Sequence, residues 1–173
     1  MPASEPLALL FADDGSIPNN PKLPVLVYKQ AVPLGADPAA AFERLFAAHG
    51  WSDGWRNGIY PFPHYHPRGH EVLGIARGHA RVRFGGGTGT EIEVAAGDVA
   101  VLPAGTGHQR IAASDDLLVV GAYPPTSDAA VERGGAAAHE RALTAIAATP
   151  LPEQDPVYGR DGPLTRLWRP NAS

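Results

Sequence analysis

The chain has 173 residues, enough for one domain with its own core, and its 14 basic and 18 acidic residues give a net charge of −4. There is no basic stripe to suit nucleic acid, and there is no cysteine for disulfides or thiol chemistry. Because the first residues lack signal-peptide features and no apolar run is long enough for a membrane span, we expect a soluble cytoplasmic protein without nucleic-acid or membrane partners.

The first elements expected along the chain are a strand and a helix. Residues 23–32 form an apolar run that predicts a strand ending at Pro33. Residues 37–50 predict a helix, in which Asp37 caps the N-terminus, Pro38 occupies the first turn and Gly50 follows the C-terminus.

From Trp55 to Tyr123 the hydrophobic period changes to two, which indicates β-strands. Glycine and proline separate the runs, and strands are predicted near 59–66, 70–77, 79–84, 90–94, 98–102, 107–112 and 117–123. The glycine-rich residues 85–90 predict a hairpin turn, since no lysine follows them as in a phosphate-binding loop. So many short strands imply a sandwich or barrel.

The C-terminal part is predicted to be helical and then irregular. A helix is expected over 129–148, interrupted at Gly134 and Gly135, with Leu143, Ile146 and Ala147 on its apolar face. The tail is broken by proline and glycine but is rich in large apolar residues, so it is expected to pack on the barrel as an arm. We therefore predict one domain over 1–173, with a core barrel at about 55–123, an N-terminal strand and helix at 23–50, and a C-terminal helix and tail at 126–170.

Histidines are concentrated in the segment "GIYPFPHYHPRGHEVLGIARG", residues 58–78. In a strand, His64 and His66 point to the same side, and Glu71 begins a strand that returns beside them. A second glycine-bounded block, "GDVAVLPAGTGHQRI", places His108 directly after a turn. Three imidazoles and one carboxylate are a ligand set that suits a divalent transition metal.

These two blocks resemble the two sequence motifs of the cupin family. In the first motif, Gly58 is followed after five residues by His64-Tyr65-His66, then after four residues by Glu71 and after six by Gly78. In the second, Gly97 is followed after five residues by Pro103-Ala104-Gly105 and after two more by His108. The Asn that ends the family pattern is absent, because Ala112 stands in its place. The stretches "LPVLVY", "HYHPRGHEVLG" and "DPVYGRDGPLTRLW" extend the resemblance to a group of small, functionally uncharacterised bacterial cupins, the YjlB-like proteins.

The resemblance implies a mainly β fold, the double-stranded β-helix or jelly-roll barrel, with an N-terminal helix and a C-terminal helix plus arm. It also implies that His64, His66, Glu71 and His108 converge on one divalent metal ion, which is Mn, Fe, Ni, Co or Zn. Adjacent strand residues face opposite sides, so only one of His70 and Glu71 enters the barrel. We favour Glu71, because its charge compensates the ion, and expect His70 at the rim or outside. The alternative to a metal site is an empty barrel with hydrogen-bonded core histidines.

Four further residues are expected to line a pocket beside the ion. Each is an even number of residues away from a proposed ligand on its predicted strand, so its side chain is expected on the same face. These residues are Tyr60, Phe62, Leu73 and Arg110. The function that we favour is a metal-dependent enzyme, of oxygenase or isomerase type, that acts on a small molecule. The alternative is a non-catalytic module that binds or senses a small ligand. The sequence names no catalytic residue. Cupins of this kind often pair, so the resemblance is compatible with a homodimer.

Overall fold

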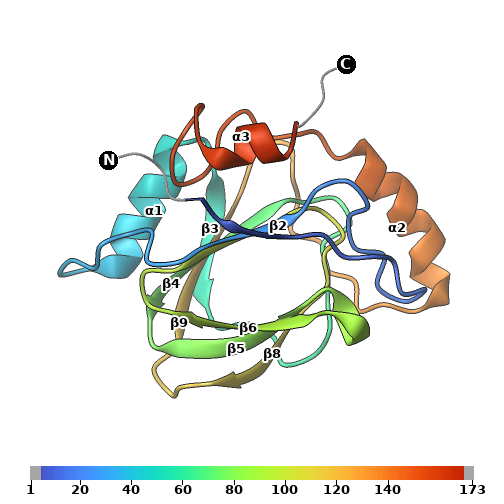
Figure 1. Ribbon diagram of the computed structural model, residues 1–173, viewed down its shortest axis with the longest axis horizontal. Coiled ribbons are helices and arrows are strands. Elements are labelled where there is room, and N and C mark those ends of the chain that lie inside the picture. Colours follow the sequence, from blue (N-terminus) through green and yellow to red (C-terminus); the bar gives the residue numbers. More distant parts are fainter. Residues whose placement is uncertain (1–4, 170–173) are drawn as a thin grey trace.

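The computed structural model describes residues 5–169, so both ends of the predicted domain, including position 170 of the predicted tail, lie outside the described residues. The described chain is mainly β, with two antiparallel sheets and a few helices (Figure 1). Its strands are β1 (Leu7–Leu9), β2 (Val25–Tyr28), β3 (Ser52–Asn57), β4 (Glu71–Arg77), β5 (His79–Phe84), β6 (Thr90–Ala95), β7 (Val99–Leu102), β8 (His108–Ala113) and β9 (Leu118–Tyr123). This is the predicted cupin fold class.

The larger sheet has the strand order β1-β2-β7-β4-β9-β3, and the smaller has the order β6-β5-β8. Strand alternation gives the larger sheet two buried faces. On β4, Leu73 and Ile75 belong to the apolar cluster shared with β5 and β6, whereas Val72 and Ala76 belong to the cluster on the other face. The face that carries Leu73 encloses the interior of the barrel. Glu71 is two residues before Leu73 on the strand, so it lies on the same face.

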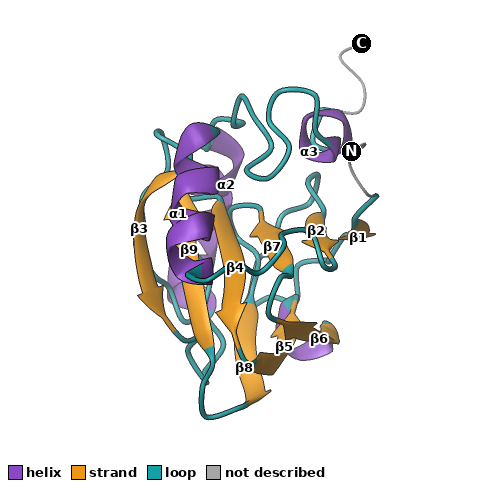
Figure 2. Cartoon of the chain, turned by 90° about the vertical axis from the view of Figure 1, so that its left-hand side faces the viewer, coloured by secondary structure: helices purple, strands orange, loops and turns teal. Residues whose placement is uncertain are grey.

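Helix α1 (Pro38–Ala48) covers the outer face of the larger sheet, where it lies against β3, β4 and β9 (Figure 2). Its predicted ends are confirmed: the Asp37 carboxylate accepts a hydrogen bond from the Ala40 amide at 3.2 Å, Pro38 begins the first turn, and Gly50 has a φ of +83°. Gly74 lets the helix approach closely, since a Cβ there would lie 2.6 Å from the Phe42 ring. The close packing of α1 therefore depends on a residue without a side chain.

The C-terminal elements confirm a helix and a packed arm but correct their details. Helix α2 (Ala136–Ala148) begins only after the two glycines, and Ala138, Ala142 and Ile146 form its buried face. The predicted face was partly wrong, because Leu143 is 37% exposed. Figure 1 shows α2 on one side of the barrel and the short helix α3 (Pro163–Leu167) across its top.

The arm packs on the outer face through Val157, Leu164 and Trp168, all of which are buried. Its anchor is the fully buried Asp155 carboxylate, which accepts hydrogen bonds from the backbone amides of Val157, Tyr158 and Leu164 at 2.8, 3.0 and 3.1 Å and from the Tyr28 hydroxyl. Buried charge is costly unless it is saturated with donors in this way. The arm is thus a fixed part of the domain.

Two strand predictions need correction. The expected strand at 59–66 is wrong: β3 lies earlier, at Ser52–Asn57, and only bridge pairs at His64 and Tyr65 extend into the predicted range. The prolines at 61 and 63 explain this, because proline cannot donate a ladder hydrogen bond. Strand β1 was not expected at all.

The glycine-rich turn between β5 and β6 is confirmed as a hairpin connection, with a single 3₁₀ turn at Gly86–Thr88. No helix in the described residues is long and apolar enough to cross a membrane.

Candidate metal centre

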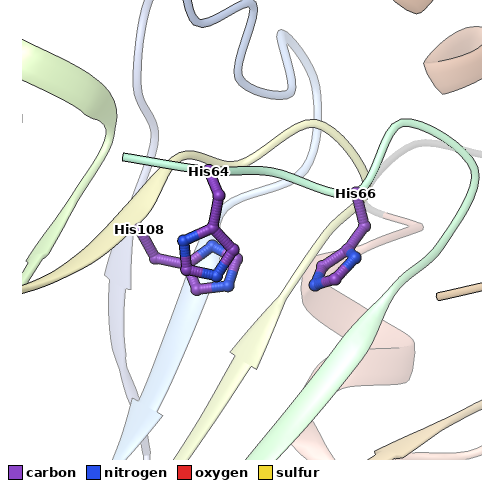
Figure 3. Close-up of side chains that lie close together, drawn as sticks. All are labelled: His64, His66 and His108. Carbon is purple, nitrogen blue, oxygen red and sulfur yellow. The ribbon is translucent and has the colours of Figure 1, made fainter. Parts of the chain in front are cut away.

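Three histidines meet inside the barrel (Figure 3). His64, His66 and His108 are buried, and each offers one nitrogen to a group whose members all lie within 4.8 Å of one another. Three buried imidazoles this close could hold a metal ion. The backbone sets the arrangement, because His64 and His108 form a bridge pair with N–H···O distances of 3.1 and 2.9 Å. The turn before His108 requires Gly105, which has a φ of +91° and lies where a Cβ would meet backbone at 2.7 Å.

Glu71 faces the same space from the start of β4. Its Oε1 atom lies 3.3 Å from Nε2 of His66 and 3.4 Å from Nε2 of His108, and only 2% of the residue is exposed. The structure therefore places the fourth predicted ligand, Glu71, against two of the three histidines, His66 and His108. His70 points to the opposite face of the sheet, as strand alternation requires.

Hydrogen bonds on the far side of each ring fix which nitrogen faces the centre. Nδ1 of His64 lies 3.0 Å from the Phe62 carbonyl oxygen. Nδ1 of His66 lies 3.1 Å from that of Ala130, and Nδ1 of His108 lies 3.0 Å from that of Thr106. A carbonyl oxygen only accepts, so each Nδ1 carries a proton and, in the neutral ring, each Nε2 presents a lone pair. In metal-binding proteins, a hydrogen bond from the ring nitrogen that does not bind the ion commonly orients the histidine in this way.

Burial and mutual charge interactions shift the pKa values of the groups in the cluster. Burial by itself would raise the pKa of the Glu71 carboxyl, but His66 and His108 lower it below its ordinary value. Burial, with the adjacent His108 ring, lowers the pKa of His64 to about 3. Burial also disfavours charge on His66, but the Glu71 carboxylate outweighs it and raises that pKa.

A cavity of about 460 Å³ opens beside these residues. It lies within the range of about 300–1,000 Å³ that small-molecule sites occupy. Of the expected lining residues, Tyr60, Leu73 and Arg110 are present, with Tyr60 49% exposed at the opening and Leu73 buried. Phe62 does not line the cavity: its ring stacks on Tyr60 at 4.8 Å and lies 3.7 Å below the Arg133 guanidinium. The Phe62 ring therefore lies outside the cavity.

Comparison with known proteins now identifies the family. A cupin-domain family model matches residues 56–120. The YjlB protein of Bacillus subtilis (strain 168) is 40% identical over 158 residues, which cover 91% of this chain and 93% of YjlB. The chain is a YjlB-like cupin.

Solved structures resemble this cupin more distantly. Acireductone dioxygenase from Bacillus anthracis, with a cadmium ion in its active centre, is 19% identical, and the match covers 64% of this chain and 80% of that chain with a TM-score of 0.39. A protein from Klebsiella pneumoniae with a double-stranded β-helix domain is 18% identical over 78% of this chain and 90% of its own, at a TM-score of 0.38. Procruciferin, an 11S globulin from Brassica napus, is 19% identical, and the match covers 46% of this chain and 21% of that chain with a TM-score of 0.38. The YjlB relative is what assigns the family.

Several residues that line the cavity were not predicted from the sequence, and Tyr123 and Trp55 are among them. Tyr123, the last residue of β9, lines the cavity, and its hydroxyl accepts a hydrogen bond from Nε1 of Trp55 at 2.8 Å. Burial and the nearby Glu71 carboxylate raise the pKa of Tyr123, so this cupin keeps a protonated phenol next to the cluster. Side-chain alternation along the predicted strand 117–123 could have identified Tyr123, because it places Tyr123 on the same face as Val119.

His70 was expected at the rim or outside the barrel, and it does face outward, away from the barrel interior. It is fully buried beneath the arm, with its ring 5.0 Å from that of Trp168. Nδ1 accepts a hydrogen bond from the Ala104 amide at 2.9 Å, so Nε2 carries the proton and donates to the Pro150 carbonyl at 3.0 Å. Both nitrogens of His70 are therefore occupied by the fold. The sequence did not reveal this because the covering segment is distant along the chain.

Proposed function

We propose that this cupin binds one divalent transition metal ion through Nε2 of His64, His66 and His108 and a carboxylate oxygen of Glu71. The supporting observation is that these acceptor atoms face one another while each Nδ1 is hydrogen-bonded to a carbonyl. Facing lone pairs and a buried carboxylate repel unless a positive charge lies among them. A proton on His66 relieves one contact, whereas a divalent cation relieves all of them. Mn, Fe, Co, Ni and Zn all suit this donor set.

We further propose that the site is catalytic and acts on a small molecule, with oxygenase or isomerase chemistry. Four protein ligands leave an octahedral ion with two open positions, and the cavity provides space for a ligand next to them. When bound, the ion would supply Lewis-acid chemistry or activate a small oxygen ligand. Around it, Leu73 and Ile59 exclude water, and the phenol of Tyr123 is placed to donate a hydrogen bond or a proton.

The test combines metal loading with a readout of open coordination positions. Protein loaded with Mn²⁺ should bind about one ion per chain and should enhance the relaxation of solvent water protons, because water exchanges at the open positions. His108→Ala should lose the ion. His79→Ala, which removes an exposed histidine on β5, is the matched control and should retain it.

Stoichiometric Mn²⁺ without relaxation enhancement would identify a closed structural site and would end the enzymatic proposal. An open position should be accompanied by turnover of a small oxygen-containing substrate that His108→Ala does not catalyse. An open position with saturable ligand binding but no turnover under any of the five metals would instead favour the binding or sensing module.

A further inference from the structure

The cavity contains a cationic side chain that the metal cluster does not use. Arg110 lies on β8 two residues after His108, and it is the only lysine or arginine among the described residues that line the cavity. The arginines of the neighbouring strand β5 point outward and are paired, Arg81 with Glu93 and Arg83 with Glu91 at 2.8 Å each. Within residues 5–169, the Arg110 guanidinium forms neither an ion pair nor a side-chain hydrogen bond.

Arg110 also lies at a useful distance from the cluster. Residues two apart on a strand are separated by about 7 Å and point to the same face. The backbone amide of Arg110 donates to the Tyr60 carbonyl at 2.9 Å, which places Arg110 beside the half-exposed tyrosine at the cavity opening. A ligand in the cavity can therefore contact Arg110 at its outer end and the metal at its inner end.

The charges in the cavity favour a negatively charged ligand. Glu71 is the only carboxylate among the described lining residues, and a divalent ion would more than neutralise it. The loaded cavity would then have an excess of positive charge, to which Arg110 adds. A guanidinium that faces apolar walls is a strong and directional partner for a planar oxyanion.

A carboxylate fits this cavity better than a phosphate. Apart from the metal cluster, the other lining residues are uncharged: Ile59, Leu73 and Val131 are apolar, and Asn57, Tyr60 and Tyr123 are neutral donors. Arg110 is therefore the only cationic side chain among the described lining residues. A phosphate carries about −1.5 to −2 charges and three acceptor oxygens, and its sites gather several donors, such as a helix N-terminus or a second basic residue. A single guanidinium can satisfy a single carboxylate with two parallel hydrogen bonds.

We propose that the substrate or ligand of this cupin is a small organic acid, with its carboxylate on Arg110 and a second oxygen donor, a few carbon atoms away, on the metal. This inference rests on the proposed metal site. It goes beyond that site because it specifies the chemical class of the ligand and the residue that selects it.

The experiment measures binding by calorimetry to Mn²⁺-loaded protein, with short carboxylates that carry a keto or hydroxyl oxygen two to four carbon atoms away from the carboxylate as probes. The uncharged amide of each acid and inorganic phosphate are the comparison ligands. Loss of hydrogen bonds to a charged group weakens binding by roughly ten- to a hundredfold. Wild-type protein should therefore prefer at least one carboxylate to its amide by about tenfold or more, and Arg110→Gln should abolish this preference.

Two controls keep the result interpretable. Arg83→Gln removes a paired arginine that points away from the cavity, and it should bind the acid within about twofold of wild type, as expected for a surface substitution. Arg110→Lys retains the charge but loses the planar fork. It should show an intermediate preference, and it serves as the test if Arg110→Gln does not fold.

The outcomes separate the two proposals. Failure of wild-type protein to bind Mn²⁺ would overturn the proposed function before any acid is added. If Mn²⁺ binds normally, three results would overturn only the organic-acid inference: no saturable binding of any acid, equal binding of acid and amide, or unchanged preference in Arg110→Gln. Tighter binding of phosphate than of every carboxylate would overturn the assignment to organic acids.

Discussion

Glu71→Gln replaces the carboxylate of the cluster with an amide of nearly the same shape. In the folded protein this carboxylate is 2% exposed and lies 3.3 and 3.4 Å from two Nε2 atoms. The amide nitrogen of Gln can donate to one of these acceptors, so the metal-free variant should fold with a melting temperature close to that of wild type. The variant should nevertheless bind metal poorly, because it no longer offsets the charge of the ion.

Removing one member of a buried charge pair typically costs about 3–5 kcal/mol. At about 1.4 kcal/mol per tenfold, the affinity for Mn²⁺ or Zn²⁺ should fall by roughly 100- to 4,000-fold. His70→Gln is the matched control, because it changes the adjacent residue on the opposite face of the sheet. It should leave the metal affinity within about threefold but should destabilise the fold by about 1–3 kcal/mol through its two hydrogen bonds, to Ala104 and Pro150.

The assay is a pair of measurements on each protein: the metal dissociation constant by calorimetry and the free energy of unfolding without metal by urea denaturation. The expected pattern is a crossed one, in which Glu71→Gln loses affinity and His70→Gln loses stability. Equal losses of affinity in the two variants, or a larger loss in His70→Gln, would refute the assignment of faces on β4.

Metal affinity should fall as the pH is lowered, and the fall should begin above about pH 6.5, because Glu71 raises the pKa of His66 and a proton there competes with the ion; calorimetry from pH 5 to 8 checks this, and a flat profile would argue against histidine ligation. Tyr123→Phe should weaken metal binding by roughly tenfold, because it removes a hydroxyl that lies beside Glu71 and His66, and Trp55→Phe is the control that leaves the phenol in place; full affinity in Tyr123→Phe would show that the phenol does not support the ligands. Asp155→Ala should lower the free energy of unfolding by at least about 3 kcal/mol, because it leaves buried amides without an acceptor; a loss below about 1 kcal/mol in urea denaturation would show that the arm has another anchor.

The parts of this structure that were predictable depend on local signals. The spacing of apolar residues and the glycine punctuation located β4 to β9 within about one residue. The capping residue Asp37 and the following Pro38 located the start of α1. Strand alternation from Glu71 also separated the inner from the outer face of β4, because one-residue steps invert the side-chain direction.

The parts that were not predictable depend on contacts between distant segments. The burial of His70 requires the arm, nearly a hundred residues later along the chain, to cover it with Trp168. The absence of a strand at 59–66 reflects two prolines overriding an alternating pattern. Tyr123 acquires its role only when β9 pairs with β4, and this pairing is not encoded near either strand.

The central claim is that the four convergent side chains bind one divalent metal. The most direct test is elemental analysis of untagged protein after incubation with Mn, Fe, Co, Ni and Zn together and removal of unbound ions, with His64→Ala as the comparison. Wild-type protein should retain about one ion in total per chain, and His64→Ala should retain almost none. Wild-type protein without metal, or the same metal content in both proteins, would contradict it.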